Sequence, residues 1–365
     1  IGTSNTINGG NVGARILVKS SGNINANVRS GQRVEFANSI IMNGSIFAAN
    51  SNASNGTTVL TGSSLSLTGN ILANGNISVG SGSISGSVTK PTNYTYTGPN
   101  PNGGIINAIP VIPALPSLPT PTFIPAAGTQ NISANITITP GAYGNVTLGG
   151  NRTITFSGPG DYIFNAINNS GTNNNFRFDF QNNPNGVFRI FVKGNAILNK
   201  STSTIINGGS ASRIYMETQG NGAGTTSNAY AFVIANGASG GVSRWFGTVY
   251  APYAGILMGS GTGSTSITGS LWSGTQVVIN SGVTTNYAAY VNCQIPTANA
   301  GPDKTINCTN SSVALDGSSN AINATYTWTA SNGGNIVSGA STATPIVNAA
   351  GTYTLTVSTG SVCTA

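Results

Sequence analysis

The sequence predicts an all-β protein in which a parallel β-helix, a solenoid of stacked coils, is followed by an immunoglobulin-like β-sandwich. The first observation is a repeat, because Val249-Tyr250 is matched 22 residues later by Leu271-Trp272. A coil of this length cannot bury its own apolar interior and must stack on its neighbours. The second observation is a change of strand pattern after Cys293. The third is that no plausible amphipathic helix longer than two turns is visible.

Composition indicates a folded chain with an unusually uncharged surface. Charged residues make up 5% of the 365 residues, glycine accounts for 50 and the net charge is +7, whereas about a quarter of an average chain is charged. The amides and hydroxyls of Asn, Ser and Thr must therefore hydrate the surface. Recurrent triplets of Val, Ile, Leu, Phe and Tyr supply enough apolar surface for a stacked core, which argues against a disordered chain.

Charge and hydropathy argue against two classes of partner. The 13 Lys and Arg outnumber the 6 Asp and Glu, but they form no basic run, so we expect no nucleic-acid binding. We interpret the nearest approach to a cluster as scattered surface charge: Arg15, Lys19, Arg29 and Arg33. No run of about 20 apolar residues occurs, so we expect no membrane insertion. The chain starts at Ile1 without a signal peptide and is interpreted as a mature or excised extracellular segment.

Residues 1–89 are predicted to form the first set of coils. A Gly-x-Ile pattern recurs at spacings of 22 and 25 residues in Gly22–Ile24, Gly44–Ile46 and Gly69–Ile71. The Gly, Asn and Ser residues between the short apolar segments suit the turn conformations at coil corners. We therefore expect these three segments at equivalent positions of successive coils.

Residues 90–129 are predicted to form a proline-rich strap or linker that is docked on the solenoid. Six prolines from Pro110 to Pro125 recur at a spacing close to three, which is the repeat of a polyproline II strand. The aliphatic residues between them are expected to form a stripe lying on the coils: Val111, Ile112, Leu115 and Leu118. A free linker would rarely carry so many aliphatic side chains, and a proline ligand of the signalling type is the less favoured alternative.

Residues 130–293 are predicted to form the second set of coils. Short alternating strands run through this segment, for example at Ile136–Ile138, Thr153–Phe156 and Phe176–Phe180. Pro-Gly and Gly-Gly pairs between them provide turns. The repeat at Val249 and Leu271 closes this second set.

Strand spacing and the positions of two aromatic residues predict that residues 294–365 form the sandwich. The expected strands are Val313–Leu315, Tyr326–Thr329, Ile336–Val337, Pro345–Val347 and Thr352–Val357. Trp328 is the expected core aromatic, and Tyr353 lies where such domains often place a corner tyrosine.

Two parts of the chain resemble known families. Pro140–Gly150, Ser157–Phe164 and Gly269–Val277 resemble an uncharacterised β-helical module of bacterial surface proteins, especially very large Bacteroidota secreted proteins that include gliding-type adhesins. Ala298–Cys308 and Gly351–Val357 resemble the PKD-like, immunoglobulin-like repeats of Bacteroidota adhesins exported by type IX secretion. The second resemblance implies tandem stalk repeats, contact with secretion machinery, further domains of the same polypeptide and a last strand after the final residue.

The three cysteines allow one bridge. Cys308 precedes the first core strand and Cys363 follows the last, so we expect a Cys308–Cys363 disulfide that restricts the unfolded chain across nearly the whole sandwich. Cys293 is then left free or pairs with Cys308 in a competing arrangement. Three cysteines without any histidine exclude a four-ligand zinc site.

The supply of reactive residues argues against catalysis, metals and cofactors. The chain contains no histidine, so Ser-His, Cys-His and His-metal mechanisms are absent. A glycosidase or calcium-assisted lyase needs paired or clustered carboxylates, but those outside the sandwich are far apart in sequence: Glu35, Asp161, Asp179 and Glu217. We therefore expect no catalytic, metal-binding or cofactor-binding residues.

The sequence favours a non-enzymatic extracellular segment that binds surface polysaccharide or another surface, with the sandwich spacing it from the cell. The residues expected to reach a ligand are Tyr250, Tyr253 and Trp272. Three alternatives stay open: a β-helix that binds or degrades acidic polysaccharide, a subunit that associates with neighbouring copies into a filament, and an ice-binding face of stacked threonines. The ice-binding alternative needs Thr137–Thr139 and Thr153–Thr155 to recur from coil to coil, which the sequence does not show.

Overall fold

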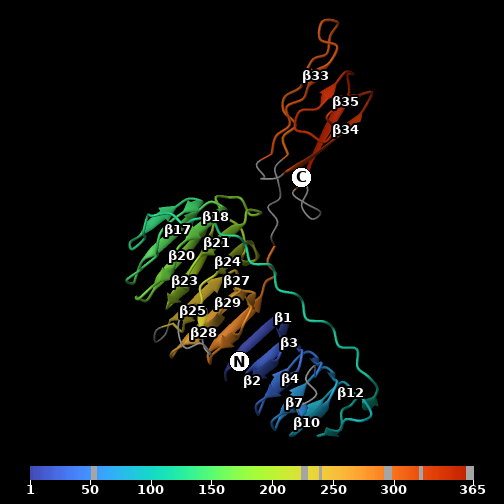
Figure 1. The fold of residues 1–365 in the computed structure, drawn as a ribbon, viewed down its shortest axis with the longest axis vertical. Coiled ribbons are helices and arrows are strands. Elements are labelled where there is room, and N and C mark those ends of the chain that lie inside the picture. The colour runs from blue at the N-terminus through green and yellow to red at the C-terminus, as the bar shows by residue number, and fades with distance from the viewer. Residues whose placement is uncertain (51–55, 223–228, 238–240, 292–297, 320–323, 359–365) are drawn as a thin grey trace. The chain divides into compact units, whose positions relative to one another are not determined.

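The computed structural model describes residues 1–50, 56–222, 229–237, 241–291, 298–319 and 324–358 (Figure 1). Contacts divide the chain into two compact units, Ile1–Asn182 with Phe188–Tyr290 and Asn183–Val187 with Val291–Ala365. Parallel strands stack throughout the first unit, so an all-β fold with a β-helix-like solenoid is confirmed. Within the described ranges the one helical element is the 3₁₀ turn η1 (Ala211–Arg213), and no helix is long and apolar enough to cross a membrane.

The coils of residues 130–290 wind through sheets that we name the head, strap and flank sheets. The head sheet contains β15 (Ile136–Ile138), β17 (Thr153–Ser157), β20 (Asn174–Asp179) and β23 (Ser201–Ile206). The strap sheet contains β16 (Gly141–Ala142), β18 (Gly160–Phe164), β21 (Phe188–Val192), β24 (Ile214–Thr218), β27 (Thr248–Ala251) and β30 (Leu271–Ser273). The flank sheet contains β19 (Ile167–Asn168), β22 (Ala196–Asn199), β25 (Tyr230–Ala235), β28 (Gly255–Ser260) and β31 (Val277–Ile279).

The coils of residues 1–107 use an N-terminal sheet and share a 12-stranded junction sheet with the second set. The N-terminal sheet contains β2 (Leu17–Ser20), β4 (Arg33–Phe36), β7 (Thr57–Thr61), β10 (Asn76–Val79) and β13 (Tyr96–Thr97). The junction sheet runs in the order β14 (Ile105–Asn107), β12 (Val88–Lys90), β9 (Ile71–Ala73), β6 (Ile46–Ala48), β3 (Asn23–Ser30), β1 (Thr6–Ala14), β32 (Val283–Tyr287), β29 (Ser264–Gly269) and β26 (Val242–Phe246). Off this path lie β5 (Ile41–Met42), β8 (Leu65–Leu67) and β11 (Gly82–Ile84).

The order of the coils in space differs from their order in the sequence. The first solenoid strand, β1, lies beside the last, β32, and the two are parallel, with Thr6 opposite Thr284 and Asn8 opposite Asn286. The coils of residues 130–290 therefore come first in the stack, and those of residues 1–107 continue from their final strand. We call this contact between β1 and β32 the junction.

Alternating burial along the strands builds one continuous core. In β3, every second side chain is buried. Aromatic rings fill the interior of the second set, where the ring centroids of Phe178 lie 4.9 Å from Phe156 and 5.3 Å from Phe188. The predicted stacking of Val249 on Leu271 is confirmed by their pairing across β27 and β30.

One predicted repeat in the first set is misaligned. Val28, and not Ile24, lies opposite Ile46. Gly44 therefore approaches Ala26 and not Gly22; its φ is +152°, and an added Cβ would lie 2.4 Å from the Ala26 carbonyl oxygen. The cause is that this circuit contains two strands, β5 and β6, where the spacing argument assumed one.

The strap, residues 108–129, connects β14 to the first coil of the second set and runs back along the solenoid (Figure 1). The expected aliphatic stripe forms only in part. Val111 and Leu118 are 85% and 45% exposed, whereas Leu115 is half-buried and packs close to Gly13. The most buried aliphatic residue is Ile124, at 7% exposure, because it is the one that reaches an apolar surface on the strap sheet.

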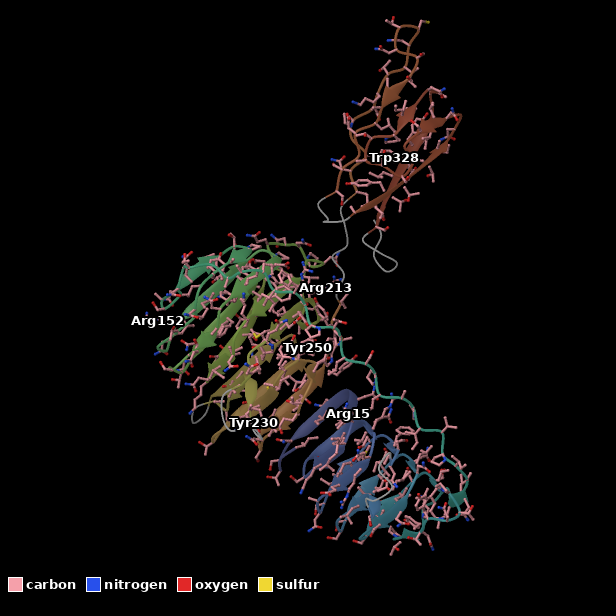
Figure 2. All side chains as sticks on the ribbon, viewed as in Figure 1. Arg15, Arg152, Arg213, Tyr230, Tyr250 and Trp328 are labelled. Carbon is pink, nitrogen blue, oxygen red and sulfur yellow. The ribbon has the colours of Figure 1, made fainter. Side chains whose placement is uncertain are left out.

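The second unit contains two antiparallel sheets. One contains β33 (Val313–Ala314), β36 (Ile346–Val347) and β35 (Ile336–Ser338), and the other β34 (Thr325–Ser331) and β37 (Thr352–Ser358). Trp328, labelled in Figure 2, is confirmed as a core aromatic at 4% exposure, and the Tyr353 hydroxyl donates to the Ala349 carbonyl at 2.6 Å. The immunoglobulin-like assignment stays a prediction. So does the bridge from the exposed Cys308, because Cys363 and Cys293 lie outside the described residues.

Candidate surface-binding site

Two outward surfaces of the solenoid are compared, one that the strap covers and one that it leaves open. The strap crosses the outward side of the strap sheet, which we call the covered face. The outward sides of the head sheet and of the neighbouring part of the junction sheet (β26, β29, β32, β1 and β3) form what we call the open face. The two sheets are joined beneath this face by the buried Ser203 of β23, whose hydroxyl accepts a hydrogen bond from the Phe246 N–H of β26 at 2.6 Å.

The covered face is held closed by a buried carboxylate. Glu217 is 0% exposed, and its Oε1 accepts hydrogen bonds from the Thr122 N–H at 2.9 Å and from Gln219 Nε2 at 2.6 Å. Its Oε2 accepts from the Tyr215 hydroxyl at 3.0 Å. Gln219 Nε2 also donates to the Thr122 carbonyl at 2.7 Å. Both backbone polar groups of Thr122 are therefore bound to the solenoid.

The aromatic residues predicted to contact a ligand are split between this covered surface and solvent. Tyr250, labelled in Figure 2, is 2% exposed and its hydroxyl donates to the Pro119 carbonyl of the strap at 2.7 Å. Trp272 is half-buried and lies edge-to-face with Tyr250, 6.4 Å between ring centroids. Tyr253 is 55% exposed. With the strap docked, Tyr250 meets the strap, and Tyr253 is the predicted residue that can meet an external ligand.

Burial shapes the titration of the tyrosines under the strap. Burial, followed by the nearby Glu217 carboxylate, raises the pKa of Tyr215 above its ordinary value, and the same two causes raise the pKa of Tyr250. Burial also raises the pKa of Tyr290, whose ring stacks on Tyr215 at 4.7 Å between centroids. The Tyr215 and Tyr250 hydroxyls stay protonated at neutral pH and donate to Glu217 and to the Pro119 carbonyl of the strap.

The open face presents columns of uncharged hydrogen-bonding side chains. Because paired residues of parallel strands lie side by side, outward positions align from coil to coil. The aligned sets are Thr153–Asn175–Thr202, Ser266–Thr284–Thr6–Asn23 and Thr268–Asn286–Asn8–Asn25. Each of these side chains is partly exposed. Together they form rows of hydroxyl and amide groups along the stacking direction.

Four asparagines form a hydrogen-bonded ladder across the junction. Asn8 Nδ2 donates to Asn286 Oδ1 at 3.0 Å, Asn25 Nδ2 to Asn8 Oδ1 at 2.9 Å, and Asn43 Nδ2 to Asn25 Oδ1 at 2.6 Å. An amide can donate and accept at once, so Asn8 and Asn25 each link the coil before them to the coil after them. The ladder joins the two sets of coils at the surface of the open face.

Arginines interrupt the uncharged columns at two places. Arg177 is exposed and lies between Thr155 and Thr204 in register. It borders a shallow depression that is also lined by Asn135, Thr137 and Thr153. Arg244 is exposed and its guanidinium lies 5.8 Å from the ring centroid of Phe246. The open face therefore adds fixed positive charge to its hydroxyls and amides.

The carboxylates are not brought together. Asp161 forms a bidentate ion pair with Arg189 at 2.6 and 2.9 Å, and Glu35 pairs with Arg33 at 3.0 Å. Asp179 lies on the head sheet and Glu217 on the strap sheet, so the two carboxylates are on different sides of the coil. Among the described residues, no group of three or more His, Cys, Asp or Glu is placed to hold a metal ion.

Sequence reasoning named three aromatic residues as ligand contacts and did not identify the open face. The Asn ladder joins residues 278 positions apart, so no local pattern marks it. The alternating polar positions of β3, Asn23, Asn25 and Asn27, were the available signal, since they predict an amide row on one side of a strand. Sequence reasoning also missed the burial of Glu217, because a single charge on a strand is usually solvated, whereas the strap buries this one.

No family model and no curated protein matches this chain. Among solved structures, the chain is similar to an ice-binding protein from an Antarctic bacterium of the Flavobacteriaceae. The two share 13% identity with a TM-score of 0.27, over 80% of this chain and 81% of that chain. A likeness at this TM-score carries no argument about fold or function.

Proposed function

We propose that this chain is a non-catalytic, extracellular binding segment of a bacterial cell-surface protein, and that its open face adsorbs to surface polysaccharide. The observation that carries the proposal is the alignment of Thr, Ser and Asn side chains into columns along the open face. A polysaccharide presents hydroxyls at regular intervals, and such a polymer can exchange hydrogen bonds with a row of donors and acceptors. The second unit, with its resemblance to stalk repeats, would space this face from the cell.

The charges of the open face favour an acidic polysaccharide. Arg177 and Arg244 are exposed, and guanidinium groups bind carboxylate and sulfate oxygens through paired, charge-assisted hydrogen bonds. The separation of Asp179 from Glu217 and the pairing of Asp161 with Arg189 support binding without bond cleavage, because a glycosidase requires two carboxylates across one bond.

Retention of the full chain on immobilised acidic and neutral polysaccharides tests the proposal. Ser266→Tyr places a bulky ring in the middle of a column and should weaken retention at least tenfold. Ser78→Tyr makes the same change on β10 of the N-terminal sheet and should leave retention unchanged. Arg177→Gln combined with Arg244→Gln should weaken binding to acidic chains selectively. Absence of retention on every polysaccharide, or equal loss in both Tyr variants, contradicts the proposal.

An ice surface is a second candidate ligand, favoured by one observation. Thr137 lies opposite Thr155 in adjacent strands, so two threonines do stack, although Arg177 occupies the next position of that column. Inhibition of ice recrystallisation by the full chain, lost in Thr155→Lys, would support this ligand. Inhibition absent at concentrations that saturate a polysaccharide column would exclude it. Sizing at several concentrations separates both candidates from a filament subunit.

A further inference from the structure

We propose that the junction is a mechanical clamp that carries tension along the polypeptide while the other coils stay outside the load path. The proposal rests on the proposed role as a segment of a cell-surface protein, and it is independent of what the open face binds. A protein that attaches a cell to a surface carries force through its backbone, so the points where the chain enters and leaves each unit decide which contacts resist that force.

The chain enters the solenoid at β1 and leaves it after β32, and these strands are neighbours in the junction sheet. Tension pulls β1 toward its amino end and β32 toward its carboxyl end. Because the two strands are parallel, these pulls act in opposite directions along one axis and load the junction in shear. Hydrogen bonds loaded in shear must break together, whereas bonds at an end coil would open one after another.

The segment before β1 lengthens the contact that shear must break. The Gly2 N–H donates to the Ile279 carbonyl at 2.6 Å, and Asn5 Nδ2 donates to the same carbonyl at 3.2 Å. The Val283 N–H donates to Asn5 Oδ1 at 2.9 Å, where the Asn5 side chain is 2% exposed. The Ser281 hydroxyl donates to the Thr3 carbonyl at 2.7 Å. Residues 2–8 are therefore bonded to residues 279–286 along their length.

Side chains reinforce the backbone contact at its far end. The Asn8–Asn286 amide bond spans the two loaded strands, and the Asn25–Asn8 bond holds the Asn8 amide in place from the unloaded side. The backbone register breaks after Asn8, where Tyr287 covers two glycines: a Cβ on Gly10 would lie 2.7 Å from its ring. Beyond β32, the Ala288 N–H donates to the Gly269 carbonyl at 3.2 Å, which ties the exit segment to the preceding coil.

Force spectroscopy on the full chain, held at its two termini, tests the clamp. At about 3.5 Å per extended residue, residues 1–290 should release about 1000 Å in one cooperative event. The second unit should release about 250 Å in a separate event, which serves as an internal reference. Release of the first unit in many small steps of one coil each, from the lowest forces upward, overturns the proposal.

A reversible crosslink gives the sharpest result. Asn8→Cys with Asn286→Cys places two thiols on directly paired positions, and a disulfide there should abolish the 1000 Å event until a reductant restores it. Asn175→Cys with Thr202→Cys is the matched control, also on paired outward positions. It should leave the event in place and shorten it by about 90 Å. Persistence of the full event with the Asn8–Asn286 positions bridged overturns the proposal. The native cysteines all follow residue 290, so they do not affect this event.

A milder pair of variants measures the contribution of the amide ladder. Asn8→Ala removes two hydrogen bonds at the junction and should raise the rupture rate at constant force by about fivefold or more, the value of one typical hydrogen bond. Asn175→Ala removes a comparable bond, from Thr204 to Asn175 Oδ1 at 3.3 Å, within the head sheet. Its rupture rate should equal that of the unmodified chain. Equal rates for both variants overturn the proposal, and polysaccharide retention, measured separately, reports on the open face.

Discussion

Replacing Glu217 with leucine should release the strap. Glu217 accepts three hydrogen bonds, but only the bond from the Thr122 N–H joins it to the strap, because Gln219 and Tyr215 belong to the solenoid as Glu217 does. A hydrogen bond to a charged group contributes about 1.5–3 kcal/mol, so its loss should favour strap opening by about 2 kcal/mol. Since 1.4 kcal/mol is a factor of ten, the strap should open about 30-fold more often.

Amide hydrogen exchange of strap peptides that contain Thr122 measures this opening directly. Glu217→Gln should have a smaller effect, about fivefold, because its carbonyl still accepts from Thr122 and Gln219 and its amide can donate to the Tyr215 hydroxyl. Glu35→Leu is the control, since Glu35 forms ion pairs with Lys19 and Arg33 at 3.6 and 3.0 Å on the N-terminal sheet. Amide exchange of the strap in Glu217→Leu within twofold of the unmodified chain would refute the role of the Glu217–Thr122 contact in holding the strap.

Further predictions concern packing, backbone conformation and pH. Phe178→Ala should lower the free energy of unfolding by about 3–5 kcal/mol in denaturant titration, whereas Ala at Phe123, which is 89% exposed, should have little effect. Gly44→Ala should cost about 1–3 kcal/mol, because φ is +152° and the Ala26 oxygen occupies the space; Gly149→Ala, with open space around it, should be neutral. Burial raises the pKa of Tyr215 in the folded chain above its unfolded value near 10. The protonated Tyr215 hydroxyl therefore contributes its full stabilisation of the fold below about pH 10, and this contribution is lost as pH rises further. Alkaline titration should therefore show that the tyrosinate absorbance of the buried tyrosines appears together with unfolding.

The sequence predicted the parts of the solenoid that depend on local pattern. The repeat that places Leu271 over Val249 is a local spacing, and the pairing of β27 with β30 follows it. The alternation in Phe176–Phe180 likewise places three rings in the core. Each of these inferences uses only the period of a strand and the length of one circuit.

The contacts that decide the arrangement of the two sets were not predictable from pattern. Thr6, Ile7 and Asn8 pair with Thr284, Thr285 and Asn286, and Thr and Asn are so common in this chain that no residue type marks the register. The contact between Glu217 and the strap was hidden for another reason: Glu217 follows the core residues Ile214 and Met216 at an outward position of β24, and only the path of the strap buries it. The same path accounts for the burial of Tyr250.

The junction has a consequence for biogenesis. During synthesis, β32, which pairs with the free edge of β1, is made only after some 278 further residues. Until then, the amino-terminal coils have one unpaired edge. An unpaired edge strand invites association with other chains, and contacts this distant in sequence close slowly. Export of the chain in an unfolded state, or a chaperone that shields β1 until residue 286 has emerged, would keep nascent molecules from joining one another through that edge.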